Sequence, residues 1–385
     1  MPSSQAKGKI LIVLGTLVVG GTESQVALLA EGLTKRGWSV EIYLLEKAGS
    51  LVGRLEAAGV PVIDGGHRSA DRRIVRRWSR LIASEACLVW RVVGSRPDVV
   101  HCFLPLTNFM GALAGRLGFV TVVTSRRALG NHQDRRPAWK WIDRVANSFS
   151  DVVTANSRAV AEDTAMRDGY DASKIVVIPN GLDFSKYDNV CGDRNETRGA
   201  LGLSSEHVAI VMVANLIPYK GHRDLIAAFA RVAASDSRLR LFLIGADRGI
   251  EWELVGAAGR LGVADRVQFL GPRDDVASLL AAMDLGVMSS HEEGFSNALL
   301  EKLAAGLPVV ATDVGGNPEA LENMPNCVLV KPRNAEDLAR GLALAIGWLG
   351  TDEPNRAIRR RLVRERYAVG AMVDAYERLY TRLSK

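Results

Sequence analysis

The chain has 385 residues, more than one ordinary hydrophobic core accommodates, so two domains are expected. Hydrophobic residues make up 48% of the sequence and charged residues 24%, a balance typical of a soluble globular protein, and every apolar run is too short to cross a bilayer. The polar start, residues 1–8, lacks the apolar core of a signal peptide, so we expect a cytoplasmic protein. The 49 basic residues only slightly outnumber the 43 acidic ones, but the excess is unevenly distributed.

The cysteines exclude two further classes of protein. The four of them are scattered and form no CxxC pair, at Cys87, Cys102, Cys191 and Cys327. We therefore expect reduced thiols, neither disulfides nor a zinc site.

Strands and helices alternate along most of the chain. We expect a strand at 9–14, a helix at 22–36, and further strands at 39–45, 60–63, 98–102, 120–124, 151–155 and 175–178. A second series of strands is expected at 208–213, 239–244, 266–270, 284–288, 309–312 and 328–330. Near-continuous apolar strands separated by helices are typical of parallel sheets covered on both faces. The fold class is therefore α/β, with two Rossmann-like doubly wound domains that bind ligands at the carboxyl ends of their strands.

The domain boundaries are placed by a turn signal and by polar sequence around residues 180–205. We expect an N-terminal Rossmann-like domain at 1–185 and a C-terminal one at 186–365. The last helix, residues 366–385, is expected to return to the N-terminal domain.

Residues 71–82 predict an amphipathic helix that is rich in arginine. Its apolar residues Ile74, Trp78, Leu81 and Ile82 share one face. The arginines lie largely around the other face, at Arg72, Arg73, Arg76 and Arg80. One interpretation is a surface helix whose apolar stripe faces the core. The other is an interfacial helix on anionic lipid with Trp78 near the headgroups, which predicts a peripheral membrane protein. Nucleic acid fits less well, because no aromatic stacking platform accompanies the arginines.

Glu293 and Glu301 lie where a buried strand turns into a helix, and this segment is the best candidate for the chemistry. Gly294 permits close backbone approach, and the start of the helix offers N–H groups and a partial positive charge to an anion. The two carboxylates accept hydrogens from sugar or ribose hydroxyls. A phosphorylated ligand rich in hydroxyl groups is therefore expected here.

Gly20 and Gly21 follow the first strand. The loop is not GxGxxG, and no Walker motif occurs in the chain, so a plain dinucleotide site is disfavoured. The two glycines either let the loop approach a bound molecule or supply a turn with positive φ.

The ordered set of motifs resembles the retaining glycosyltransferases of family 4, whose GT-B architecture has two facing Rossmann-like domains. The resemblance covers nearly all of residues 9–330. It is carried by GGTESQ at 20–25, DVVH at 98–101, ANS at 155–157, VIPNGLD at 177–183, PYKGH at 218–222, FLGPR at 269–273, the Glu293-x7-Glu301 spacing and GLPVVA at 306–311.

The resemblance implies an enzyme that binds a UDP- or GDP-sugar in its C-terminal domain and an acceptor in its N-terminal domain. By this resemblance Glu293 would contact the donor sugar, Glu301 the ribose and Lys220 the diphosphate, where it stabilises the leaving group. The remaining implied donor contacts are the backbone N–H groups of Phe295, Ser296 and Asn297, the glycines Gly294, Gly20 and Gly21, and Arg273 near the base.

One position departs from the family pattern. Family members commonly carry an arginine five residues before the lysine, and here that position is Asn215. The intervening residues are uncharged. We therefore expect weaker diphosphate binding than usual, or a cation supplied from elsewhere, with Arg223 and His222 as neighbouring candidates.

The acceptor side is expected at the strand ends of the N-terminal domain. His101 matches a family histidine near the reaction centre; its alternative is a packed histidine at a strand end. Asn108 is either an acceptor contact or a helix cap. Arg126 and Arg127 either face an acidic acceptor such as a lipid diphosphate or are solvated.

The implied reaction retains the anomeric configuration through a front-face displacement, with a double displacement through Glu293 as the alternative. No Asp-x-Asp signature stands at a strand end, so no metal ion or other cofactor is expected. The leading hypothesis is transfer of one sugar to a lipid-linked or polysaccharide-precursor acceptor at the cytoplasmic membrane face. The alternatives are a nucleotide-sugar epimerase and a catalytically silent protein that binds sugar nucleotides.

Overall fold

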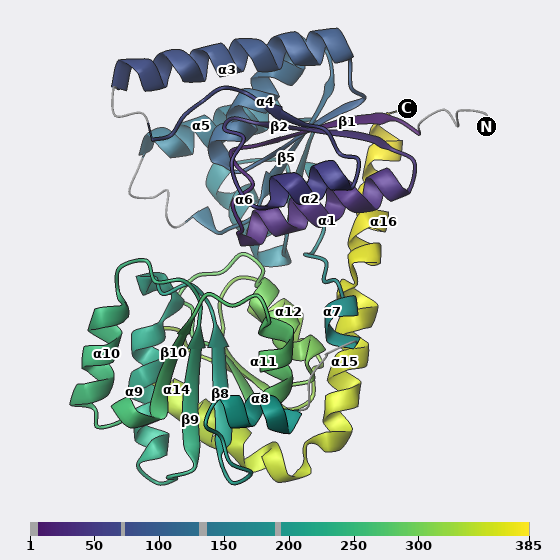
Figure 1. Ribbon diagram of the computed structural model, residues 1–385. Helices are drawn as coiled ribbons and strands as arrows, with labels where there is room; N and C mark the ends of the chain where they lie inside the picture. Colours follow the sequence, from purple (N-terminus) through teal and green to yellow (C-terminus); the bar gives the residue numbers. More distant parts are fainter. Residues whose placement is uncertain (1–6, 71–73, 131–136, 189–193, 385) are drawn as a thin grey trace. The chain divides into compact units, whose positions relative to one another are not determined.

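The computed structural model describes residues 7–70, 74–130, 137–188 and 194–384 (Figure 1). The chain divides into two compact units. The first comprises Met1–Gly181 and Val369–Lys385, and the second comprises Leu182–Ala368. These boundaries lie within a few residues of the expected ones at 185 and 365. No helix in the described parts of the chain is long and apolar enough to cross a membrane.

The first unit is built on a parallel sheet of seven strands, which follow one another in the order β3-β2-β1-β4-β5-β6-β7. The strands are β1 (Lys9–Leu14), β2 (Ser39–Leu44), β3 (Val62–Asp64), β4 (Val99–Phe103), β5 (Thr121–Arg126), β6 (Val152–Ala155) and β7 (Ile175–Val177). In register, Ile12 of β1 pairs with Ile42 of β2 and with His101 of β4. The direction of winding reverses between β1 and β4, which places the ligand crevice of a doubly wound sheet there.

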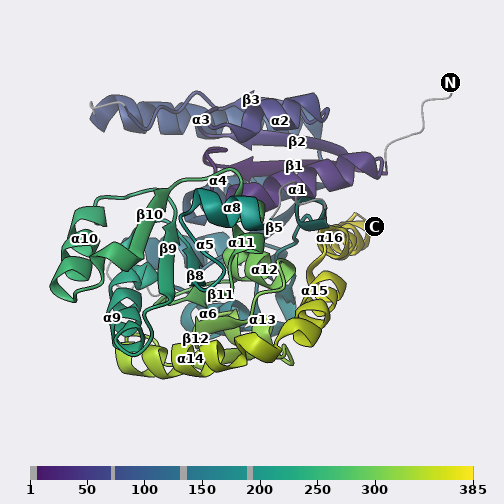
Figure 2. The same ribbon diagram turned by 60° about the horizontal axis from the view of Figure 1, so that its bottom comes forward.

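Helices cover both faces of this sheet (Figures 1 and 2). One face carries α1 (Gly21–Lys35), α2 (Leu51–Ala57) and α16 (Val369–Leu383), which pack with Ile10, Ile12 and Leu14. The opposite face carries α3 (Ile74–Ser95) and α4 (Pro105–Leu117), which pack with Leu11 and Val13. Alternate residues of β1 thus enter separate cores, which is why the strand is apolar throughout. The unit also contains α5 (Pro137–Ser148), α6 (Arg158–Asp168) and the 3-10 turn η2 (Ala172–Lys174).

The last helix, α16, is fixed to the first unit by a charged cluster and by buried aromatic rings. The carboxylate of Glu377 accepts hydrogen bonds from Lys7 Nζ at 2.9 Å, Arg36 Nη1 at 2.8 Å and Trp38 Nε1 at 3.0 Å. Tyr380 of the same helix is fully buried. The C-terminal helix is therefore part of the first unit, although the second unit precedes it in sequence.

The second unit has a six-stranded parallel sheet in the order β10-β9-β8-β11-β12-β13. Its strands are β8 (Val208–Val213), β9 (Leu239–Ile244), β10 (Val267–Gly271), β11 (Leu285–Met288), β12 (Val309–Thr312) and β13 (Cys327–Val330). Here the winding reverses between β8 and β11.

Two cores lie on the two faces of this sheet. One contains α9 (His222–Ala233), α10 (Glu251–Arg260) and α14 (Ala335–Trp348), and the other contains α11 (Val276–Ala282), α12 (Asn297–Ala304) and α15 (Glu353–Tyr367). The remaining elements are α7 (Ser185–Asp188), α8 (Arg194–Ala200), α13 (Asn317–Leu321) and the 3-10 turns η3 (Pro218–Lys220), η4 (Ala264–Arg266) and η5 (Leu349–Thr351). The prediction of an α/β protein with two doubly wound parallel sheets is confirmed.

Candidate functional site

Three loops of the second unit meet at the carboxyl ends of its central strands. They follow β8 (residues 214–221), β11 (residues 289–296) and β12 (residues 313–316). Backbone hydrogen bonds join them: His291 N donates to Tyr219 O at 2.7 Å, and Gly316 N donates to Gly294 O at 2.8 Å. Because β8 and β11 flank the reversal of winding, these loops border the crevice where a doubly wound sheet binds its ligand.

Glu293 and Lys220 lie in contact at this edge. Lys220 Nζ is 2.6 Å from Glu293 Oε1, and Ser290 Oγ donates to the same oxygen at 2.7 Å. The Glu293 side chain is 9% exposed and that of Lys220 is 18% exposed. The two groups predicted to meet the donor sugar and the diphosphate thus come from opposite sides of the reversal and form one fixed pair.

Two glycines permit the close approach of the loops. Gly221 has φ 73°, and a Cβ built there would lie 2.0 Å from Ser289 O. Gly315 has φ 52°, and a Cβ there would lie 1.8 Å from Glu293 O. Both positions combine a left-handed backbone with contact against another backbone, so a side chain at either would push the Glu293 loop out of place.

The start of α12 lies directly after Glu293. Ser296 caps the helix, and its Oγ accepts from Leu299 N at 3.3 Å. Gly294 and Phe295 are buried, and the Phe295 ring packs against that of Tyr367 at 5.3 Å. Asn297 is half-buried as the first residue of the helix. The helix N-terminus is thereby held next to the Lys220–Glu293 pair, where its partial positive charge favours an anion.

Glu301 lies in α12, one turn beyond its start, and is partly exposed. Burial raises the pKa of its carboxyl group, and the neighbouring charges of Lys302 and Lys186 oppose that rise. Lys186 belongs to α7, so the charge of that short helix acts on Glu301.

Lys302 is a functional candidate that sequence reasoning missed. Its side chain is fully buried, and its Nζ donates to Ala298 O at 3.1 Å and lies 3.3 Å from Met288 Sδ. Burial lowers the pKa of this ammonium group, while the charges of Glu301 and Glu293 oppose the effect. Gly286 of β11 makes room, since a Cβ there would lie 2.6 Å from Lys302 Cδ. The only signal in the sequence was a lysine at an apolar position of the helical pattern.

Two other predicted donor residues, Asn215 and Arg273, have partners outside the Glu293–Lys220 pair. Asn215 is exposed, and its Oδ1 accepts from Ala246 N at 3.1 Å, which ties the loop after β8 to the loop after β9. Arg273 follows the edge strand β10 and forms a two-pronged pair with Asp275 at 2.7 and 2.6 Å.

The two candidates for the missing cation differ in burial and charge. His222 is 1% exposed, and burial lowers its pKa to about 4, so the ring is neutral at pH 7. Arg223 is exposed and pairs with Glu253 at 3.3 Å.

His101 of the first unit is not at the surface of a site. It is fully buried, and both ring nitrogens have partners: Nδ1 lies 2.5 Å from Tyr380 Oη and Nε2 lies 2.8 Å from Ser125 Oγ. Burial lowers its pKa to about 3. These are the contacts of the predicted alternative, a packed strand histidine, which here holds α16 against β4 and β5. A catalytic role of His101 stays a prediction.

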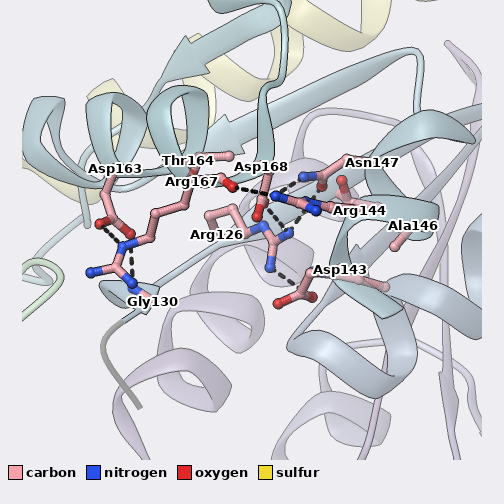
Figure 3. A network of polar contacts seen from close by, with 12 residues as sticks. Arg126, Gly130, Asp143, Arg144, Ala146, Asn147, Asp163, Thr164, Arg167 and Asp168 are labelled. Carbon is pink, nitrogen blue, oxygen red and sulfur yellow. Dashed lines mark hydrogen bonds and ion pairs between the residues drawn. The ribbon is translucent and has the colours of Figure 1, made fainter. Parts of the chain in front are cut away.

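Arg126 is also held by polar contacts within the first unit (Figure 3). Its guanidinium pairs with Asp143 at 2.7 Å and with Asp168 at 2.8 Å, and it donates to Asn147 Oδ1 at 3.2 Å. Asp143 is fully buried, and burial raises the pKa of Asp168 against the opposing charge of Arg126. Arg126 thus fastens α5 and α6 to the end of β5, and its charge is matched inside the fold by Asp143 and Asp168. A contact between Arg126 and an acceptor stays a prediction.

Arg127 follows the last residue of β5. Its Nη2 donates to Asn180 Oδ1 at 2.6 Å, and burial lowers the pKa of the guanidinium, opposed by Tyr376 and Glu23. Glu23 stands in the first turn of α1, and burial raises its pKa. The solvated alternative for Arg127 does not hold, since the side chain faces Glu23 and Asn180.

Asn108 is buried in the first turns of α4, and its Nδ2 donates to Ser125 O at 3.1 Å. Its Oδ1 has no partner among the residues described. Since α4 begins at Pro105, Asn108 is not its cap.

Gly20 precedes α1 with φ −155°, and Gly21 is the first residue of that helix. A Cβ at Gly20 would meet only the Glu23 carboxylate. Neither glycine has a positive φ, so the alternative of a positive-φ turn does not hold.

The arginine-rich helix is the start of α3. Arg72 and Arg73 lie outside the described residues, as do residues 131–136 and Cys191. Arg76, Trp78 and Arg80 are exposed. Across the described chain, no cluster of three or more His, Cys, Asp or Glu side chains suits a metal ion.

Comparisons with known proteins identify the family to which the chain is similar. Residues 19–186 match the model of the family described as Glycosyltransferase Family 4, and residues 207–346 match that described as Glycosyl transferases group 1. A D-inositol 3-phosphate glycosyltransferase of Actinosynnema mirum is 30% identical over 355 residues, which cover 86% of this chain and 84% of the relative. The protein of the same description from Rhodococcus opacus is 29% identical over 352 residues, 85% of this chain and 78% of the relative.

Solved structures show the same fold. The crystal structure of Anabaena Alr3699/HepE in complex with UDP superposes with a TM-score of 0.84 at 24% identity, covering 97% of this chain and 100% of that one. WaaG, a glycosyltransferase involved in lipopolysaccharide biosynthesis, gives a TM-score of 0.77 at 18% identity, covering 97% and 99%.

Proposed function

The chain belongs to the family 4 glycosyltransferases and has their GT-B fold, and from this premise we propose that it transfers a sugar from a nucleotide diphosphate sugar with retention of configuration. The proposed acceptor is lipid-linked or a polysaccharide precursor at the cytoplasmic membrane face. The observation that carries the proposal is the contact between Lys220 and Glu293 beside the start of α12.

The donor chemistry follows from this contact. Lys220 and the N-terminus of α12 provide positive charge where the diphosphate would gather negative charge as the bond to the sugar breaks. Glu293 would accept hydrogen bonds from the sugar hydroxyls and Glu301 from the ribose. The structure of HepE was solved with UDP and with UDP-glucose, which supports a nucleotide sugar as the donor of this chain as well. With Lys220 as the cation, the proposal requires no divalent ion, so EDTA should leave turnover unchanged.

A front-face displacement is the better-supported mechanism. Oε1 of Glu293 is already engaged by an ammonium group and a hydroxyl group, which lowers its tendency to attack carbon. In the front-face route the departing phosphate oxygen takes the proton of the acceptor hydroxyl, and Glu293 only orients the sugar. Double displacement through Glu293 would leave a glycosyl-enzyme that mass spectrometry detects after a donor-only incubation.

An acidic acceptor is favoured by Arg127 at the strand edge of the first unit. The relatives are described as acting on inositol 3-phosphate, which is also an anionic acceptor. The exposed arginines of α3 support a peripheral position on anionic lipid, where a lipid-linked acceptor would be found.

The experiment that tests this function measures release of UDP or GDP from a panel of nucleotide sugars, with and without a lipid extract as acceptor source. We expect release that depends on the acceptor. Glu293→Ala should lose at least roughly a hundredfold in rate, as removal of one group that positions the reacting sugar typically does. Glu292→Ala is the matched control and should keep the wild-type rate.

The rival functions predict other outcomes. A silent binding protein would bind a nucleotide sugar and never release the nucleotide, and an epimerase would convert the sugar without any acceptor. Full activity of Glu293→Ala would refute the assigned site itself.

A further inference from the structure

A cavity of about 380 Å³ lies in the first unit. Its volume is in the range of small-molecule sites, about 300–1,000 Å³. The described residues that line it come from α3, α4, α5 and the segment after β3: His67, Arg77, Trp78, Leu81, Ile82, Glu85, Leu106, Phe109, Met110 and Ile142. Most of these side chains are apolar, so the cavity suits a hydrocarbon.

The outer face of α3 continues this apolar surface along the helix. Val75, Trp78, Ile82, Trp90 and Val93 are exposed, Val75 by 81% and Trp90 by 74%. Their spacing of three, four, eight and three residues puts them on one side of the helix. A single exposed apolar side chain is ordinary, but a stripe over the length of a 22-residue helix indicates a surface that contacts an apolar phase.

Positive charge borders the same surface. Arg76, Arg77 and Arg80 are exposed near the start of α3, and Arg77 also lines the cavity. Within the described parts of the chain, no carboxylate pairs with Arg76 or Arg77. An apolar stripe with arginines beside it complements an anionic headgroup attached to hydrocarbon.

The cavity also adjoins the helix that starts at the acceptor edge. Leu106, Phe109 and Met110 face the cavity from the first turns of α4. That helix follows β4 directly, at the reversal of winding, and the turn between them holds Leu104 at φ 75°, a rare value for a residue other than glycine. Asn108, a predicted acceptor contact, stands on the same turns of α4.

We propose that this cavity takes one hydrocarbon chain of the lipid-linked acceptor, drawn from an anionic membrane surface on which α3 rests. The proposal rests on the proposed function and adds to it the part of the acceptor that the first unit holds. In this arrangement the arginines of α3 lie at the level of the lipid headgroups, and the exposed apolar side chains of α3 enter the membrane interface. The hydrocarbon chain of the acceptor passes between α3 and α4.

Glu85 is the one acidic group among the described residues of the lining. Both carboxylate oxygens are buried and have no hydrogen-bond partner among the described residues. Burial raises its pKa to about 7, so the group is partly neutral at physiological pH and tolerates neighbouring hydrocarbon.

The test uses dodecyl phosphate, a single twelve-carbon chain with an anionic headgroup, titrated into the full chain by calorimetry below its micelle concentration. We expect saturable one-to-one binding that inorganic phosphate does not reproduce. Leu106→Trp fills the cavity and should weaken binding by roughly tenfold or more, because several buried CH2 groups lose their site. Ile82→Asp, at an exposed position of the lining, should weaken binding similarly without affecting folding.

Trp90→Ser is the matched control, since it lies on the stripe outside the cavity. It should bind dodecyl phosphate as the wild type does and bind phosphatidylglycerol vesicles less well.

Wild-type affinity of Ile82→Asp and Leu106→Trp for dodecyl phosphate would overturn the proposal, and so would equal binding of phosphate and dodecyl phosphate. UDP titrated into the same samples distinguishes failure of the cavity proposal from failure of the proposed function. UDP binding without dodecyl phosphate binding refutes the cavity proposal alone. Dodecyl phosphate binding without UDP binding refutes the donor site alone.

Discussion

The structure identifies the residues that hold the carboxylate of Glu293, which the sequence alone did not show. The position of Glu293, Glu301 and Lys220 near one sheet edge was predictable, because strand ends and helix starts are visible in the pattern of apolar residues. The hydrogen bond from Ser290 and the supporting glycine at 315 were not, because they depend on how three loops approach one another. The donor roles of these residues stay predictions.

Polar residues at strand ends were the least predictable. His101 and Arg126 have the same local pattern as site residues, but their partners lie far away in sequence, at Tyr380, Asp143 and Asp168. Whether a strand-end polar group is buried is decided by those partners, which no local pattern specifies.

Asn215→Arg tests the missing cation. The new guanidinium would stand in the loop after β8 and should tighten UDP binding by about fivefold, a charge-assisted contact worth roughly 1 kcal/mol. Asn215→Ala loses the bond to Ala246 N in the same way but adds no charge, so it should bind UDP as the wild type does. Calorimetry of UDP binding checks both. An unchanged or lower affinity of Asn215→Arg for UDP would contradict the hypothesis that the missing cation at position 215 weakens diphosphate binding.

Lys302→Met tests the buried ammonium. Because burial lowers the folded-state pKa of Lys302 from its usual 10.5, the unfolded chain binds more protons in the interval below 10.5, and wild-type stability rises with pH across it. Methionine fills similar space without a charge and should stabilise the protein by roughly 1–3 kcal/mol near pH 6, with a smaller gain near pH 10. Guanidinium unfolding at both pH values measures this. A loss of stability at pH 6 would show that the ammonium group contributes favourably.

At the scale of elements, the strands were well predicted, because residues buried on both faces give apolar runs that few other structures allow. The placement of α3 was not predictable: an amphipathic pattern shows that a helix has an apolar face but not what covers it. In the structure Trp78 and Ile82 are 59% and 69% exposed, so the core interpretation does not hold for them.

Glu377→Gln tests how α16 is held. Hydrogen bonds from Lys7 and then Trp38 lower the pKa of Glu377 to about 2 from 4.5. A lowered carboxyl pKa contributes stability above pH 4.5 that is lost as the pH falls toward 2. The variant should lose about 1 kcal/mol at pH 7, a modest value because the group is near the surface, and should match the wild type near pH 2. Thermal unfolding followed by circular dichroism measures both. An equal loss at both pH values would mean that the charge is not what holds α16.

At the scale of the whole molecule, the chain combines two units of the same architecture that use their reversal points differently. The second unit places a lysine, a glutamate and a helix N-terminus around its reversal, whereas the first places Arg127, Asn108 and the apolar cavity near its own. Length and the two series of strands were enough to predict this division. The assignment of donor to one unit and acceptor to the other came from the family resemblance and stays a proposal.

The central claim is that Lys220 holds a nucleoside diphosphate, and titration of UDP and GDP into the full chain tests it most directly. We predict that the wild type binds one of them and that Lys220→Met loses roughly tenfold to a hundredfold in affinity, the worth of one charge-assisted contact. Arg223→Met, an exposed arginine three residues away, should bind as the wild type does. Equal affinity of Lys220→Met and the wild type, or no binding of either nucleotide by the wild type, would contradict the account.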